Sequence, residues 1–250
     1  MHPDLAKKFP NIQAYEGIGI DDPTATIRFE VTPNGIAAMI WSAKRGTQVI
    51  QVLQSDEAEK KYLVYDKKTA ARTHQNKFAC HTNHVEEVDN LAHQMARSSN
   101  SDGVLRTYRL ALAVTGEYTT LYGGTKAGAM AAMTTTINRV NGILKRDVAV
   151  ELQLIADNDQ IIFTNAATDG YSNNDSGKML DENQTNIDNI IGNDNYDIGH
   201  VFSTGNGGVA YLGAACTAGI KAGGVTGAQL PQGDAFDLSL IHISEPTRPY

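Results

Sequence analysis

The second half of the chain changes its hydrophobic spacing several times, and this constrains the fold more than any single motif. Apolar residues alternate over 110–114, recur every three or four positions over 130–144, and alternate again over 148–154. A helical spacing returns over 180–191, and a further apolar run covers 198–202. Alternation is typical of strands and the longer spacing of helices. Strands separated by helices predict an α/β fold with a largely parallel sheet and covering helices.

Local signals mark where these helices begin and end. Thr125 precedes the first helical stripe, where its side-chain oxygen can cap free backbone N–H groups. Gly192 follows the second stripe, where a glycine commonly ends a helix. A short fourth strand is expected over 209–212, after the glycine-rich segment 205–208. That segment lacks the Gly-x-Gly-x-x-Gly spacing and any following Gly-Lys-Ser/Thr, so we interpret it as a tight turn rather than a phosphate cradle.

The N-terminal part of the chain has a purely strand-like pattern. Apolar residues alternate over 27–31 and 36–40, and Pro33-Asn34-Gly35 between them is typical of a turn, which together predict a β-hairpin. Two further strands are expected within 49–65. We therefore assign residues 1–72 to a small β-rich region.

The segment that joins the two parts is expected to be helical. Apolar residues at helical spacing predict one amphipathic helix over 84–97, and the polar stretch 98–103 has the composition of a linker. The expected organisation is a β-rich region, a helix with its linker, an α/β region and a tail. These parts span residues 1–72, 73–103, 104–237 and 238–250.

Charge and composition exclude several partners. The 250 residues carry a net charge of −7, with 41% hydrophobic and 20% charged residues, which is typical of a globular chain. Nucleic acid is not expected as a partner, because phosphate binding requires clustered Lys and Arg. No apolar run approaches the roughly 20 residues of a membrane span, so none is expected. The first ten residues contain no hydrophobic signal region, and two cysteines are too few to indicate a redox compartment.

Three histidines near one cysteine are candidate metal ligands. His81, His84 and His93 match no common zinc spacing, so we interpret them as a solvated helix face. The neighbouring Cys80 leaves a second possibility open, in which the thiolate of a pro-region caps a catalytic zinc.

For several other polar residues, a purely structural role is weighed against a functional one. Four oxygen-bearing residues in one segment could suit calcium: Asp169, Asn173, Asn174 and Asp175. They do not fit the EF-hand spacing, so an exposed, turn-rich loop is expected there. Glu117, at the end of the first strand of the α/β region, is interpreted as a surface cap. His200, within an apolar strand, is interpreted as a hydrogen-bonded core residue.

Six segments of the α/β region resemble, in the same order, the catalytic domain of bacterial reprolysin-like (adamalysin-type) zinc metallopeptidases. They are residues 108–118, 133–142, 146–150, 183–188, 197–205 and 208–216. The last segment matches a Gly-x-Ala-Tyr-x-Gly-x-x-Cys pattern that begins at Gly208 and ends at Cys216. Residues 4–70 resemble the β-rich pro-region of the same proteins.

The resemblance implies a metzincin, which is a secreted zinc endopeptidase. Three histidines of an extended His-Glu-x-x-His-x-x-Gly-x-x-His motif would hold the zinc, and the glutamate would act as general base. The resemblance also implies that a peptide or protein substrate pairs with an edge strand of the sheet. The matching positions are Gly208, Val209, Ala210, Tyr211 and Leu212. A secreted enzyme carries a signal peptide, so this chain is expected to lack its natural start.

The chain departs from the family near its C-terminal end. His-Glu-x-x-His occurs nowhere in residues 1–250, and the resemblance stops at Asp237. Residues 238–250 resemble the translation of a sequencing-library adapter, so we interpret this tail as non-native and its His242 as no zinc ligand. We therefore expect an inactive fragment with no catalytic residues and no bound zinc. The alternative is a non-catalytic secreted binding or inhibitory module.

A fragment without the active-site helix should leave one face of the sheet uncovered. The side chains expected to be partly exposed are Leu110, Leu112, Leu152 and Leu154. Each large apolar side chain left in water forfeits about 1.5–3 kcal/mol. The fragment is therefore expected to be partly molten or prone to aggregation.

Overall fold

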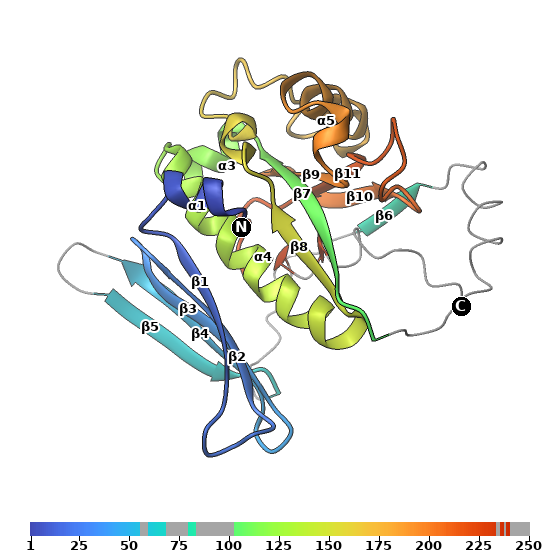
Figure 1. Ribbon diagram of the computed structural model, residues 1–250. Coiled ribbons are helices and arrows are strands. Elements are labelled where there is room, and N and C mark those ends of the chain that lie inside the picture. The colour runs from blue at the N-terminus through green and yellow to red at the C-terminus, as the bar shows by residue number, and fades with distance from the viewer. Residues whose placement is uncertain (56–59, 69–79, 84–102, 234–235, 238, 241–250) are drawn as a thin grey trace.

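One long helix separates two β-sheets. A computed structural model of the chain describes residues 1–55, 60–68, 80–83, 103–233, 236–237 and 239–240. An antiparallel sheet from the N-terminal part, which we call the N-terminal sheet, lies on one side of helix α4 (Lys126–Val148). A mostly parallel sheet, the second sheet, lies on its other side (Figure 1). The β-rich region and the α/β region therefore share α4 as a common layer.

The N-terminal sheet follows chain order, and each strand is antiparallel to the next. Its strands are β1 (Gln13–Ile18), β2 (Thr26–Thr32), β3 (Gly35–Ser42), β4 (Gly46–Ser55) and β5 (Lys60–Asp66). The expected hairpin is confirmed as β2 and β3, which pair from Thr26–Trp41 to Thr32–Gly35. Gly35 has a φ of +129°, a conformation that L side chains disfavour, so the turn requires glycine at this position.

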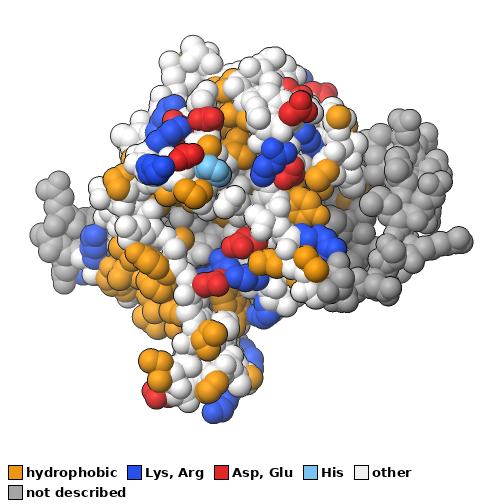
Figure 2. All heavy atoms as spheres, viewed as in Figure 1, with side chains coloured by type: hydrophobic (Ala, Val, Ile, Leu, Met, Phe, Trp, Pro, Cys, Tyr) orange, Lys and Arg blue, Asp and Glu red, His pale blue; other side chains and the backbone are white. Residues whose placement is uncertain are grey.

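The face of the N-terminal sheet that meets α4 packs closely against the helix. Met39, Trp41 and Val49 form a buried cluster with Ile143 of α4. A Cβ atom at Gly142 would lie 2.0 Å from the Trp41 ring, so glycine is what lets the indole approach the helix. The opposite face is largely apolar, and Figure 2 shows hydrophobic side chains gathered over this sheet. Exposed members of that face, by strand register, are Tyr15, Val31, Ile36, Tyr62 and Val64.

The second sheet has the strand order β6-β10-β11-β9-β7-β8. Its strands are β6 (Cys80–Asn83), β7 (Arg106–Val114), β8 (Val150–Leu154), β9 (Ile198–Ser203), β10 (Gly207–Tyr211) and β11 (Gly224–Gly227). Every neighbouring pair is parallel except β10 with β11. The expected α/β class with a largely parallel sheet is confirmed.

Two helices cover the two faces of the second sheet. Alternate residues of β7 divide between them: Leu110 and Leu112 share a core cluster with α4, whereas Ala111 and Ala113 share one with α5 (Ser176–Ile190). Both helices have the expected ends. The Thr125 hydroxyl accepts a hydrogen bond from the Gly128 N–H at 3.1 Å, and Gly192 follows α5 with a φ of +87°.

The expected exposure of the sheet leucines was wrong. Leu110 and Leu112 are 0% exposed, and Leu152 and Leu154 are 1% exposed. Helix α4 covers this face together with Leu5 of α1 and Tyr118 of α3, so the predicted loss of a layer does not uncover these side chains. The face is closed further by residues from both ends of the described chain: Leu5, Ile12, Phe236 and Leu240.

Several short elements were not expected. They are α1 (Pro3–Lys8), β1, β6, α3 (Gly116–Leu121), β11 and two 3₁₀ turns at Asn158–Ile161 and Asn193–Asn195. Val148, expected in a strand, is the last residue of α4. The missed elements are short, and the few apolar residues in each show no clear period. The helix expected over 84–97 lies outside the described residues.

Candidate functional site

The strand expected to bind a peptide is β10. It contains Gly208, Val209, Ala210 and Tyr211, and Leu212 follows its last residue. The side chains of Val209 and Ala210 are 4% and 2% exposed. Tyr211 is partly exposed and donates a hydrogen bond from its hydroxyl to Asp181 Oδ1 at 3.3 Å. These side chains are therefore used within the fold, so recognition of a peptide strand by β10 would depend on its main-chain groups.

The outer side of β10 is paired within the same chain. β6 runs parallel to it, with a register from Gly208–Cys80 to Tyr211–Asn83. An exposed edge was expected at β10, whereas the structure places this strand second in the sheet. Hydrophobic spacing could not reveal β6, because it has only four residues and their pairing partner lies more than 120 residues away along the chain.

The glycine-rich segment before β10 is a close turn, as expected. A Cβ atom at Gly205 would lie 2.2 Å from the carbonyl oxygen of Asn173, and Gly207 has a φ of +93°. The first position needs glycine for close approach and the second for its backbone conformation. The turn thus joins the end of β9 to β10 and fixes where β10 begins.

Three of the four candidate calcium ligands accept hydrogen bonds within the protein: Asp169, Asn173 and Asp175. Asp169 is 3% exposed, and its carboxylate accepts hydrogen bonds from the N–H groups of Gly116 at 2.8 Å and Tyr171 at 2.9 Å. The Asn173 Oδ1 accepts from the Thr115 hydroxyl at 3.0 Å. Asp175 caps α5. The loop is turn-rich and largely exposed, as expected, with Asn174 and Asp175 among its exposed residues. Asp169 is the exception, because it is buried and fastens the loop to the end of β7.

His200 is a core residue, as expected. Its side chain is 1% exposed, and its Nε2 lies 3.0 Å from the hydroxyl of Thr226. Burial lowers the pKa of His200 to about 3, so the imidazole is neutral at physiological pH. Across the described residues, no group of three His, Cys, Asp or Glu side chains converges on one point. The donor set described here therefore does not fit a zinc ion.

Glu117, interpreted from the sequence as a surface cap at a strand end, lies within helix α3. The N-cap of α3 is Thr115, whose hydroxyl accepts a hydrogen bond from the Tyr118 N–H at 3.3 Å. Glu117 lies in the first turn instead, beside a shallow hollow of about 380 Å³ at the carboxyl ends of β7, β9 and β11. The other residues that line this hollow are Thr120, Leu121, Ala166, Thr204 and Gln229.

A buried ion pair that sequence analysis missed holds the chain near residue 237. Arg139 and Asp237 are 4% and 2% exposed, and Arg139 Nη1 lies 2.6 Å from Asp237 Oδ2. The Thr136 hydroxyl donates to the other carboxylate oxygen at 2.6 Å. Next to this pair, the ring of Phe236 packs on Tyr118 and Phe202. In the sequence, Arg139 resembles any other charged residue of an amphipathic helix.

Comparison with known families gives one match. A family model described as metallo-peptidase family M12B, reprolysin-like, matches residues 104–245. The match covers more than half of the 250 residues and extends past residue 237, where the resemblance seen in the sequence stops. No curated protein matches the chain. Within the described ranges, no helix has both the length and the hydropathy for a membrane crossing.

Proposed function

This chain belongs to the reprolysin-like metallopeptidases of family M12B, and on that basis we propose that it is part of a secreted zinc-dependent metalloendopeptidase whose peptide substrate docks along β10. The position of β10 is the observation that carries the docking proposal. The strand lies one place from the end of the second sheet, next to a strand of only four residues. Extended peptides commonly bind by adding a strand to a sheet, where main-chain groups supply the hydrogen bonds.

A peptide can reach the outer side of β10 only after β6 has left it. β6 pairs with β10 in parallel, and parallel pairing is slightly less stable per residue than antiparallel pairing. β6 thus keeps the docking strand closed until it is displaced. Cys80 is the first residue of β6, so the possible capping of a catalytic zinc by its thiolate also belongs to this closed arrangement.

Zinc would supply a Lewis acid and an activated water in the family reaction. The described residues of this chain do not offer the required ligand set, and His200 is already buried against Thr226. His-Glu-x-x-His is also missing from the sequence. We therefore propose that the chain, as it stands, does not cleave peptides, and that its own contribution is the docking strand and the scaffold around it.

Replacing residues 238–250 with a segment that carries His-Glu-x-x-His-x-x-Gly-x-x-His tests this assignment. We expect the unaltered chain to leave casein intact. The altered chain, once β6 has been displaced from β10, should cleave casein in a reaction that a zinc chelator stops. Stoichiometric zinc and chelator-sensitive cleavage by the unaltered chain would contradict the proposed inactivity. Failure of a folded altered chain to cleave would contradict the peptidase assignment.

Proline substitutions in the cleaving chain test the docking strand. Neighbouring N–H groups of a strand between two partners point to opposite sides, so either Val209→Pro or Ala210→Pro removes an N–H from the outer side of β10. Losing that hydrogen bond should raise KM roughly tenfold while zinc remains bound. Val209→Ala keeps every N–H and serves as the control. An unchanged KM in both proline variants would show that the substrate docks elsewhere.

A non-catalytic binding or inhibitory module is the second candidate, and the missing motif is the observation that favours it. Such a module would hold a peptide at β10 without cleaving it. Because residues 238–250 are interpreted as non-native, the natural gene beyond the codon for Asp237 distinguishes the two functions. A His-Glu-x-x-His motif within about ten codons supports the peptidase, since that is where the family places it, and a genuine stop codon supports the module.

A further inference from the structure

A buried carboxyl group lies where the N-terminal sheet meets α4. Glu30 of β2 is 1% exposed, and its Oε2 accepts a hydrogen bond from Asn138 Nδ2 of α4 at 2.7 Å. Its other oxygen, Oε1, is buried and has no hydrogen-bond partner among the described residues. Buried carboxyl groups normally satisfy both oxygens, because an unpaired buried polar atom costs free energy. Ionisation of Glu30 at this interface is therefore unfavourable.

The charged groups that face Glu30 do not neutralise it. Arg139 of α4 lowers the pKa of the Glu30 carboxyl group, whereas Asp237 raises it. Arg139 is paired with Asp237 at 2.6 Å, so the Asp237 carboxylate offsets much of the positive charge that would otherwise stabilise ionised Glu30. The residues opposite Glu30 on the neighbouring strands are Ala14 and Ala37, which carry no charge.

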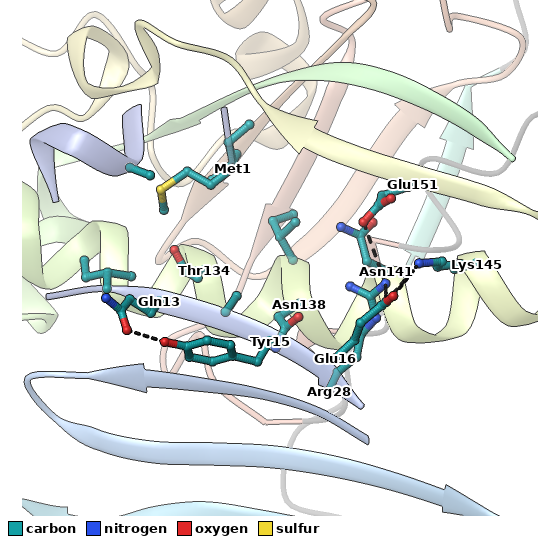
Figure 3. Close-up of a pocket in the computed structure, with 15 residues that line it drawn as sticks. Met1, Gln13, Tyr15, Glu16, Arg28, Thr134, Asn138, Asn141, Lys145 and Glu151 are labelled. Atoms are coloured by element: carbon teal, nitrogen blue, oxygen red, sulfur yellow. Dashed lines mark hydrogen bonds and ion pairs between the residues drawn. The ribbon is translucent and has the colours of Figure 1, made fainter. Parts of the chain in front are cut away.

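A separate set of ion pairs lies along the same interface (Figure 3). Arg28 of β2 pairs with Glu16 of β1 at 2.7 Å, and Lys145 of α4 pairs with Glu16 at 2.9 Å. Glu151 of β8 lies 3.7 Å from Arg28. These groups compensate one another beside a cavity of about 560 Å³, and Asn138 also lines that cavity. Glu30 itself is not among the residues that line this cavity, so its carboxyl group is separate from these ion pairs.

Burial raises the pKa of Glu30 from 4.5 to about 7. Removal from water is the largest cause, because it disfavours the charged form. The neighbouring Asn138, Arg139 and Thr135 oppose this effect without cancelling it, and Asp237 adds to it.

We propose that Glu30 is a pH-responsive clamp: its neutral carboxyl group holds the N-terminal sheet on α4, and its ionisation favours release of the sheet. Once the sheet is released, Glu30 returns to water and its carboxylate is solvated. Ionisation thus stabilises the released state relative to the docked one. The clamp does not depend on peptidase activity, because all of its groups belong to the interface between β2 and α4 and to the adjoining Asp237.

The direction of the pH effect follows from the raised pKa. The docked form binds the proton more tightly than the released form, so docking is fully favoured below about pH 4.5 and weakens as the pH rises through about 7. Between pH 5.5 and pH 8.5, the docking equilibrium constant should fall on the order of 30-fold.

The single tryptophan of the chain reports on this interface. Trp41 is 8% exposed and packs against Gly142 of α4, so release of the sheet should shift its fluorescence to longer wavelength. Urea titrations followed by Trp41 fluorescence should show weaker docking at pH 8.5 than at pH 5.5 in the wild-type chain. Glu30→Gln keeps the shape of the side chain and cannot ionise, so we expect it to lose most of this pH dependence.

Glu16→Gln is the matched control, because Glu16 lies at the same interface but its side chain is 55% exposed. This variant should keep the wild-type fall in docking between the two pH values. A Glu30→Gln variant that weakens as much as the wild type, or a wild type that does not weaken, would overturn the proposal. Carbon-13 NMR titration of the wild-type carboxyl groups gives a test that needs no variant. Glu30 should titrate near pH 7, and a midpoint below pH 5 would overturn the clamp as well.

Discussion

Replacing Arg139 with alanine should lower the free energy of unfolding by about 3–5 kcal/mol, because the Asp237 carboxylate would remain buried without its opposite charge. The two side chains are 4% and 2% exposed and are joined at 2.6 Å. Such a loss is a large share of the roughly 5–15 kcal/mol that keeps a domain folded. Urea denaturation followed by circular dichroism at neutral pH measures the effect.

Two control variants show whether the loss of stability comes from breaking a buried ion pair or from removing a positive charge anywhere in the chain. Lys7 pairs with Asp4 at the surface, with a side chain that is 77% exposed, so Lys7→Ala should change stability little. The double variant Arg139→Met with Asp237→Leu removes both buried charges, and it should recover much of the loss. If Arg139→Ala behaves like Lys7→Ala, the ion pair does not hold this part of the chain.

Replacing Leu112 with alanine should lower the free energy of unfolding by about 2–5 kcal/mol, because it removes buried methyl groups and leaves a cavity. Leu112 is 0% exposed in the layer between β7 and α4, although the sequence suggested that it would be partly uncovered. Leu121→Ala provides the control, since this leucine at the end of α3 is 49% exposed. Similar stabilities for the two variants would indicate the partly open sheet that was first expected. Thermal and urea denaturation of both variants decide between these outcomes.

The long, periodic elements could be predicted because their signals are local. The β2–β3 hairpin follows from alternating residues around Pro33-Asn34-Gly35, and α4 and α5 follow from apolar stripes with capping residues at their ends. The same periodicity placed β7 and β9 and predicted a largely parallel sheet. These features depend on residues only a few positions apart, so one sequence is enough to show them.

The short elements could not be predicted in this way. β6 and β11 have four residues each, and each is stabilised by a strand from elsewhere in the chain. The helix α1 adds Leu5 to the core of the α/β region, although it precedes the β-rich strands in sequence. Hydrogen bonds and burial supplied by distant partners decide such elements, and intrinsic propensity does not.

The sequence by itself determined the fold class, the main helices and strands, and the family resemblance that the match over residues 104–245 confirms. Only the tertiary structure decided which polar groups meet. It pairs β6 with β10, brings Glu30 to Asn138 across 108 residues, and brings Arg139 to Asp237 across 98 residues. The reason is physical: whether a carboxyl group is solvated or buried depends on the surfaces that pack around it, and periodicity along the chain carries no information about those surfaces.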